Sequence, residues 1–341
     1  MVKKILLGIV LLLLIVLASQ FSLIYYGWMQ AKGQIKIIWE AKPIEEFLSS
    51  SDYPDSLKLK LKLIQEVKAF AFEQLGINNS KNYSSLYDQK GQPIMWVVTA
   101  CEPFALAPKN WTFPLLGSVP YKGFFNPAMA EKEATLLRNE GYDVGVRNPG
   151  GWSTLGWFND PILSEMLTKN HGQLAELIIH ELTHSTIFVK DSVTFNENLA
   201  SFIGRKGAVL FLQSKYGEES SHLEEYLREE KAYDQIVHHF INGANLLDSL
   251  YSNFSPKLDE SEKIKKKQWL ILNIMNNMDT LTLFNVSNGR TIDDELPNNT
   301  YFMSFLRYRS KQTDFDKEFY QTFDGNLKNY ITYYKLKHPF L

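Results

Sequence analysis

The spacing of apolar residues predicts mostly helix in the second half of the chain and short strands before it. From residue 171 onward, apolar side chains recur every three to four positions, which indicates amphipathic helices at 195–216, 221–251 and 262–278. A further helix is expected at 56–75, where Gly76 ends the pattern. Between about 90 and 160 short β-branched and aromatic runs, separated by proline and glycine, predict a small sheet with strands at 94–99, 118–125 and 142–146. We therefore expect an α+β fold that is mainly helical.

The N-terminus has a different pattern. Residues 5–29 contain no charged side chain, and about 20 apolar residues are enough to span a bilayer. Lys3 and Lys4 precede this stretch and Tyr25, Tyr26 and Trp28 lie near its end, which is typical of a helix whose N-terminus faces the cytoplasm. We predict a transmembrane anchor at 1–30 and a single-pass membrane protein whose main domain faces outside the cytoplasm. A cleaved signal peptide is the alternative, with Val16 and Ala18 before the cut.

Charge and cysteine content exclude several classes of protein. The 36 Lys and Arg residues nearly balance the 38 Asp and Glu residues, so nucleic-acid binding is not expected. Cys101 is the single cysteine, which excludes an intramolecular disulfide, and we expect its thiol to be buried. Residues 31–341 suffice for one large domain, with the small sheet at about 90–160, helices at about 172–216 and a helical C-terminal part at 218–341.

One stretch, His180-Glu181-Leu182-Thr183-His184, has the HExxH pattern of hydrolytic zinc sites. Residues four apart on a helix share a face, so both imidazoles can bind one metal ion. Glu181 lies beside them and can take a proton from a water whose pKa the bound zinc lowers to roughly 7. The neighbouring residues of 172–190 are apolar at helical spacing, and polar groups buried among them need a cation to offset their desolvation.

A catalytic zinc site usually takes three protein ligands, so a third is expected. The metzincin continuation HExxHxxGxxH is excluded, because Ile187 stands at its glycine position and Lys190 at its third histidine. Glu197, which follows a short polar loop, is the candidate instead. On a helix starting near Asn196, it shares a face with small residues that allow close approach to the HExxH helix, namely Ala200, Ser201, Gly204 and Ala208. We predict one Zn²⁺ per chain, bound by His180, His184 and Glu197.

These residues belong to a set of blocks that resembles a known family. The blocks are Gly33-Gln34, Lys42-Pro43-Ile44, 111–125 with Phe113-Pro114 and Tyr121-Lys122-Gly123-Phe124-Phe125, 153–161, the HExxH stretch, Phe195-Asn196-Glu197 and Pro297-Asn298-Asn299. In them the chain is similar to the bacterial putative aminopeptidases, membrane-associated proteins that look like gluzincin zinc peptidases. The resemblance implies a zincin-like domain with a small sheet over the HExxH helix, the three zinc ligands named above, and Glu181 as catalytic base. Many relatives look like lipoproteins with a lipobox cysteine, whereas this chain has Leu17-Ala18-Ser19-Gln20 there, so no lipid anchor is expected.

Three functions remain open at this point. A zinc aminopeptidase needs a carboxylate near the metal for the free amino group of its peptide substrate, and Glu102 and Asp160 are candidates. A zinc endopeptidase would use the same chemistry in an open cleft. The third function is that of a non-catalytic, membrane-tethered zinc protein, against which Glu181 argues, because a structural zinc needs no base beside it.

Two further parts of a peptidase site have several candidates each. A hydroxyl that stabilises the developing oxyanion is expected from a later helix, and Tyr251, Tyr301 and Tyr308 qualify equally. A sheet edge that holds an extended peptide by strand addition is expected within 121–125 or 153–157, although these residues equally suit a strand core. The sequence does not indicate an oligomeric state.

Overall fold

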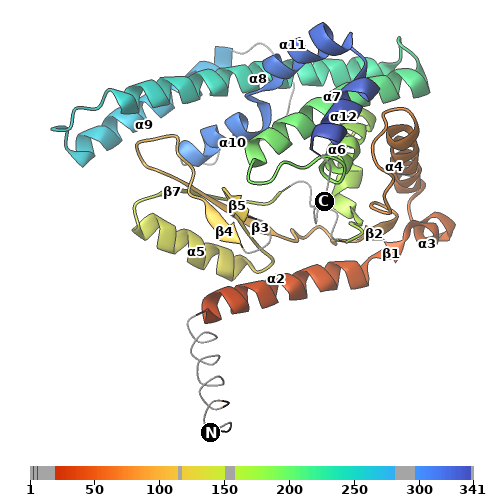
Figure 1. The fold of residues 1–341 in the computed structure, drawn as a ribbon, viewed down its shortest axis with the longest axis horizontal. Helices are drawn as coiled ribbons and strands as arrows, with labels where there is room; N and C mark the ends of the chain where they lie inside the picture. Colours follow the sequence, from red (N-terminus) through yellow and green to blue (C-terminus); the bar gives the residue numbers. More distant parts are fainter. Residues whose placement is uncertain are drawn as a thin grey trace.

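The computed structural model describes residues 20–113, 117–149, 158–280 and 296–338, together with Lys3 and Leu6. Helices predominate (Figure 1). The elements up to β8 are α2 (Phe21–Glu40), β1 (Lys42–Pro43), α3 (Ile44–Ser49), α4 (Asp55–Glu73), β2 (Ser85–Tyr87), β3 (Trp96–Cys101), β4 (Trp111–Phe113), β5 (Gly117–Val119), β6 (Lys122–Phe124), α5 (Pro127–Asn139), β7 (Asp143–Arg147) and β8 (Ile162–Leu163). After the short 3-10 helix η1 (Ser164–Thr168) come α6 (His171–His184), α7 (Val193–Tyr216), α8 (Ser221–Ser252), α9 (Glu260–Asn276), η2 (Asn277–Thr280), α10 (Asn299–Arg309), α11 (Gln312–Phe323) and α12 (Leu327–Lys337).

The predicted strands form an antiparallel sheet in the order β6-β3-β7. Its central strand pairs Val98 with Lys122 on one side and with Val146 on the other. Two smaller sheets, β1-β2-β8 and β4-β5, accompany it, so the single small sheet expected from the sequence is replaced by three. Cys101 at the end of β3 is fully buried, as predicted, and burial raises the pKa of its thiol to about 12.

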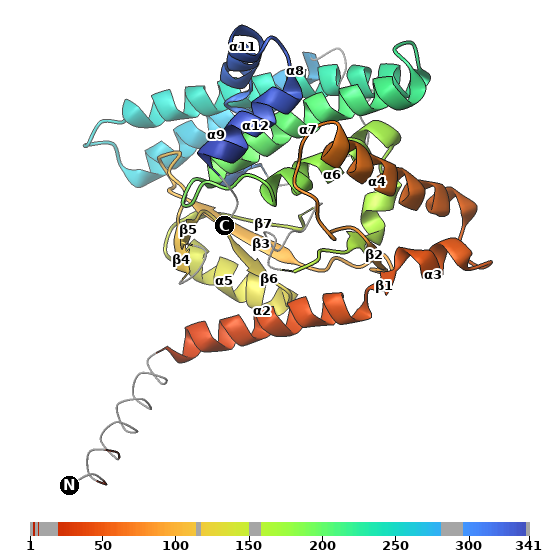
Figure 2. The same ribbon diagram turned by 45° about the vertical axis from the view of Figure 1, so that its right-hand side comes forward.

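The helices predicted from the apolar pattern are confirmed as α4, α7, α8 and α9, and two of them also have a capping side chain at the start. Ser220 and Asp259 cap α8 and α9 by accepting hydrogen bonds from the first-turn backbone, and Gly217 ends α7 at a φ of 90°. The main core joins α4, α6, α7, α11 and α12, and a second core joins α8, α9 and α10. In Figures 1 and 2, α5 lies on one side of the sheet β6-β3-β7, and α7 and α10 lie on the other.

The prediction of an N-terminal transmembrane helix has to be corrected. In the part of the chain that the structure describes, no helix is both long and apolar enough to cross a bilayer. The single-pass membrane location that depended on such a helix is therefore not supported either. Positions 1, 2, 4, 5 and 7–19 of the predicted span lie outside the described residues. From Phe21 onward the span belongs to α2, which continues beyond residue 29 and carries Lys32, Lys36 and Glu40.

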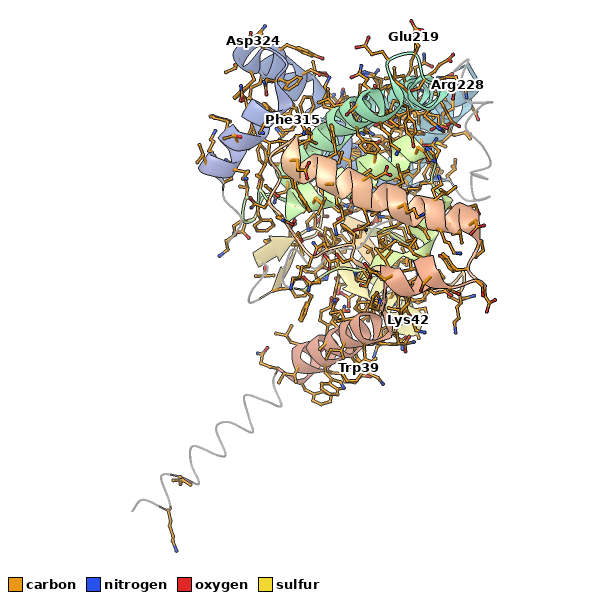
Figure 3. The ribbon with its side chains drawn as sticks, turned by 90° about the vertical axis from the view of Figure 1, so that its right-hand side faces the viewer. Trp39, Lys42, Glu219, Arg228, Phe315 and Asp324 are labelled. Atoms are coloured by element: carbon orange, nitrogen blue, oxygen red, sulfur yellow. The ribbon has the colours of Figure 1, made fainter. Side chains whose placement is uncertain are left out.

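Helix α2 instead packs along the edge of the sheet. The Tyr26 hydroxyl donates a hydrogen bond to the Gly123 carbonyl at 2.8 Å, and the Gln30 amide donates to the same oxygen. Close approach requires a glycine at Gly33, where a Cβ would lie 2.2 Å from the Phe125 ring. Figure 3 shows α2 below the body of the protein, with Trp39 near its C-terminal end. The β6 edge, one of the two candidates for peptide binding, is thus covered by α2; the other candidate, 153–157, lies outside the described residues.

Candidate metal centre

The HExxH stretch forms the last two turns of α6. Asn170 caps this helix through a 2.9 Å hydrogen bond from the Gln173 backbone, and a row of fully buried apolar residues anchors it in the main core, namely Leu174, Ala175, Ile178, Ile179 and Leu182. The helix ends at His184 itself. His184 is 6% exposed and Glu181 is 9% exposed, so the polar side chains lie at the boundary of the core.

Glu197 comes from α7, which begins three residues earlier than expected, at Val193. The small residues predicted to share its helix face are all buried, and Ser201 and Gly204 among them lie against α6. A Cβ on Gly204 would lie 2.9 Å from the backbone oxygen of Glu176 and 3.2 Å from the His180 Cβ. Contacts this short leave no room for a larger side chain, so glycine allows the α7 backbone to approach the helix that carries the histidines.

The structure brings the three predicted ligands together. The Nε2 atoms of His180 and His184 are 3.1 Å apart, and each lies near the Glu197 Oε2, at 3.5 Å and 3.6 Å. Their ligand atoms all lie within 4.8 Å of one another, which identifies a group that could hold a metal ion. Two imidazole nitrogens and one carboxylate oxygen converging from two helices match the donor set of a three-ligand catalytic metal site.

The charges of the group depend on one another. Burial alone would raise the pKa of Glu197, but the attraction of His184 and the hydrogen bonds from both imidazoles hold it well below its usual range. Burial alone would lower the pKa of His184, but the charge of Glu197 and its hydrogen bond raise it overall. The carboxylate of Glu197 thus favours the protonated form of the His184 imidazole, and a bound metal would compete with that proton.

Two asparagines beside Glu197 fix its position, and neither role could be predicted from the sequence. Asn196 exchanges two hydrogen bonds with the backbone of Val189, at 2.9 Å and 2.8 Å, and so closes the loop between α6 and α7. Asn198 is fully buried and donates a hydrogen bond to the Arg307 carbonyl at 2.5 Å. This bond connects α7 with the C-terminal part of α10. Ser201, one turn beyond Glu197, lies 3.5 Å from the His180 Nδ1 and can orient that ring.

Of the three tyrosines predicted as possible oxyanion donors, Tyr308 alone lies beside the metal group. Tyr251 donates to Asn299 at 2.7 Å, and Tyr301 packs on Phe240 and Phe305, so both belong to the second core. Tyr308 lies beside the metal group: burial and the nearby charge of Glu197 raise the pKa of its hydroxyl. Its oxygen accepts a 3.4 Å hydrogen bond from Arg147, which leaves its proton available for donation.

A second tyrosine that the sequence did not single out also lies here. Burial and the charge of Glu197 raise the pKa of Tyr121 well above its usual value. The guanidinium of Arg307 lies over its ring, 5.8 Å from the centroid. Tyr121 precedes β6 and Arg307 lies on α10, so the sheet and the second core both contribute side chains to the metal group's surroundings.

The carboxylates proposed to bind a substrate amino group are not at the metal. Glu102 has an exposed side chain, and its backbone carbonyl accepts a hydrogen bond from Asn299 in the second core. Asp160 is 1% exposed, and its backbone oxygen accepts from the Tyr83 nitrogen. Tyr83 is buried within electrostatic range of both Glu181 and Asp160, and the burial of Asp160 means that this carboxylate is not open to a substrate.

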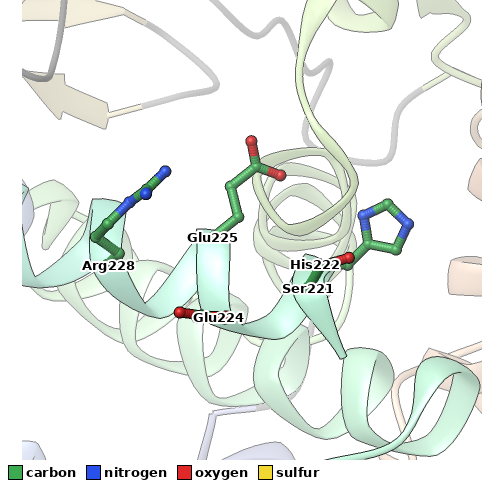
Figure 4. A pocket seen from close by; sticks show the side chains of 5 residues that line it. All are labelled: Ser221, His222, Glu224, Glu225 and Arg228. Carbon is green, nitrogen blue, oxygen red and sulfur yellow. The ribbon is translucent and has the colours of Figure 1, made fainter. Parts of the chain in front are cut away.

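A surface hollow of about 400 Å³ lies at the start of α8 and shares no residue with the metal group. Five side chains line it: Ser221, His222, Glu224, Glu225 and Arg228 (Figure 4). Its two glutamates do not form a group with its histidine that could hold a metal ion, since His180, His184 and Glu197 make up the candidate group within the described residues.

Comparison with known proteins agrees with the site. The family model described as "Putative aminopeptidase" matches residues 25–337. The chain belongs to this family. No curated protein and no solved structure matches the chain. Membership implies a peptidase, and the matched region contains the whole metal group.

Proposed function

We propose that the protein is a zinc-dependent aminopeptidase whose metal is held by His180, His184 and Glu197. The observation that carries this proposal is the convergence of the two Nε2 atoms and the Glu197 carboxylate within 4.8 Å, inside a chain of the aminopeptidase family. Nitrogen and carboxylate donors in a three-ligand set suit zinc. When bound, zinc supplies Lewis acidity that lowers the pKa of water and polarises the scissile carbonyl.

The catalytic steps are assigned to the side chains around the metal group. Glu181 follows His180 directly on α6, so its carboxylate projects beside the metal; it removes a proton from the attacking water and passes it to the leaving amine. Tyr308 keeps its proton at neutral pH, because the pKa of its hydroxyl is raised, and donates a hydrogen bond to the developing oxyanion. Arg147 holds the Tyr308 oxygen in place.

The test compares Glu181→Gln with Glu219→Gln, a matched change at an exposed residue of the loop between α7 and α8 (Figure 3). We expect Glu181→Gln to retain one zinc per chain but to lose at least about 10²-fold in kcat, the usual contribution of a general base. Glu197→Ala should lose the metal itself, and Glu219→Gln should behave as the wild type. Full activity of Glu181→Gln would overturn the mechanism.

A second comparison addresses the type of peptidase. An amino-terminal fluorogenic peptide and its N-acetylated form differ in the free amino group that an aminopeptidase requires. We expect hydrolysis of the free form alone. Equal rates on both would identify an endopeptidase with the same zinc chemistry.

A further inference from the structure

Arg307 is a buried arginine that has no acidic partner in the described part of the chain. It is 5% exposed, and its guanidinium lies 5.8 Å from the centroid of the Tyr121 ring. Arg205 and Arg309, by contrast, each pair with carboxylates. Arg205 lies 2.7 Å from Asp234, and Arg309 lies 3.4 Å from Glu176 and from Glu230. Burying a charge without such a partner is costly, so an unpaired guanidinium at a candidate active site indicates a place for an anion.

Arg147 adds a second positive charge at the same place. It stands at the end of β7, with its guanidinium 5.8 Å from the Tyr308 ring centroid and its Nη2 on the Tyr308 oxygen. In the described residues it has no carboxylate partner either. Tyr308, which Arg147 contacts, follows Arg307 directly on α10, so the two arginines lie in the same region. Burial lowers the pKa of Arg307, and repulsion from Arg147 acts in the same direction.

The two arginines lie beside the metal group. Glu197 is an electrostatic neighbour of Arg307 as well as of Tyr121 and Tyr308. Asn198, next in sequence to Glu197, bonds the backbone of Arg307 directly. An anion held between Arg147 and Arg307 would therefore be close to a peptide bound for hydrolysis.

Charge balance gives the reason to expect an anionic substrate. A divalent metal ion is neutralised by the two carboxylates of the site, Glu197 and Glu181. The positive charge of the buried Arg307 then remains uncompensated, and Arg147 adds a second positive charge from the exposed side. Arginine binds carboxylates through two parallel hydrogen bonds, so a carboxylate on the substrate would satisfy both the charge and the donors.

We propose that Arg307 and Arg147 bind a substrate carboxylate next to the scissile bond, so that the enzyme prefers peptides with an acidic group at that place. The inference rests on the proposed peptidase function and specifies its substrate class. The carboxylate has two sources: the free C-terminus of a very short peptide, or an acidic side chain. Both present the same group to the arginines.

Two substrate pairs separate these sources. Ala-Phe and its C-terminal amide differ in the α-carboxylate alone, and the C-terminal amides of Ala-Asp and Ala-Asn differ in the side-chain carboxylate alone. For zinc-loaded wild type we expect kcat/KM to be at least about tenfold higher for the acid than for the neutral member of one pair, as one charge-assisted contact provides. Arg307→Gln should reduce this ratio to about one, and Arg147→Gln should reduce it in part.

Arg138→Gln is the matched control, because Arg138 is an exposed arginine on α5 that pairs with Glu131. It should keep the wild-type ratio. The proposal is overturned if wild type shows no preference in either pair. It is also overturned if Arg307→Gln slows both members of a pair by the same factor. That result would mean that Arg307 stabilises the oxyanion or the folded protein, and not a substrate carboxylate.

A binding measurement separates this proposal from the peptidase function. Calorimetry with the inactive Glu181→Gln variant should show that it binds Ala-Phe or Ala-Asp-amide at least about tenfold tighter than the neutral partner, and adding Arg307→Gln should remove the difference. If the acidic peptide binds more tightly but wild type does not hydrolyse it, the peptidase function is contradicted and the carboxylate site is not. If wild type hydrolyses acidic and neutral peptides equally well, the carboxylate site is contradicted and the peptidase function is not. If Arg307→Gln does not fold, Arg147→Gln at the exposed strand end provides the same test.

Discussion

Asn198 connects two segments that are 109 positions apart in the sequence. Its amide donates to the Thr194 and Arg307 carbonyls, and its Oδ1 accepts from the Lys311 backbone at 2.9 Å. It therefore holds Tyr308 and Arg307 beside Glu197. Such a role cannot be predicted from sequence, because the partners are backbone groups of a distant helix and carry no side-chain signal. The histidines and Glu197 could be predicted, because their spacing along α6 and α7 is set by helix geometry.

Replacing Asn198 tests this connection. In Asn198→Ala, buried backbone groups lose their partners, which we expect to lower the free energy of unfolding by about 2–3 kcal/mol. The metal should stay bound, while kcat falls because α10 is no longer held against α7. Chemical denaturation, metal analysis and kinetics measure the three effects. Asn253→Ala is the control, since that amide bonds an exposed carbonyl at the end of α8. Equal stability of the two variants would contradict the role of Asn198.

The protonation of His184 predicts how metal affinity changes with pH. The net effect of burial and of Glu197 is to raise the pKa of this imidazole above its usual value of about 6.5. Below the raised pKa, metal must displace a proton, so the apparent affinity should fall by about tenfold per pH unit. Glu197 stays ionised over this range because its pKa is depressed. Competition titrations with a chromophoric chelator should show the decline beginning above pH 6.5; constant affinity down to pH 6 would contradict the assignment.

At the scale of elements, helices were easier to predict than the segments between them. The pattern at 221–251 corresponds closely to α8, Ser221–Ser252, because the long amphipathic face and the serine N-cap both indicate a helix that starts at this position. The start of α7 was placed too late, since the polar loop before it ends in a turn that Asn196 closes by hydrogen bonds to the backbone of Val189. The N-terminal prediction was wrong for another reason: counting apolar residues does not show that α2 uses Tyr26 and Gln30 to pack on β6.

The packing of α7 on α6 predicts a strong effect at Gly204. A methyl group there meets the Glu176 backbone oxygen and the His180 Cβ, neither of which can move freely. We expect Gly204→Ala to separate the helices, to destabilise the protein by about 1–3 kcal/mol and to weaken metal binding by about tenfold or more. Gly27→Ala on α2 is the matched control, because nothing lies within 4 Å of its added Cβ. Calorimetric metal titration of both variants would show whether helix spacing controls the site; unchanged affinity in Gly204→Ala would refute it.

At the scale of the whole molecule, the site lies where three packed units meet. The metal group comes from α6 and α7 in the main core, Tyr308 and Arg307 come from α10 of the second core, and Tyr121 and Arg147 come from the sheet. Each unit could be predicted in outline from its own periodicity. Their mutual arrangement depends on long-range contacts such as those of Asn198, so the complete set of site residues could not be read from the chain.

Metal removal should therefore be visible in the stability of the whole protein. An ion that bridges α6 and α7 binds the folded state alone, and at a free concentration of about 100 times its Kd it stabilises by about 2.7 kcal/mol. For a chain of 341 residues we expect Tm to fall by about 4 °C when a chelator removes the metal. His184→Ala lacks one ligand, so its Tm should be low from the start and should not respond to the chelator. Differential scanning calorimetry of both proteins, with and without chelator, provides the measurement. A chelator effect of equal size in His184→Ala would show that the stabilising ion is bound elsewhere.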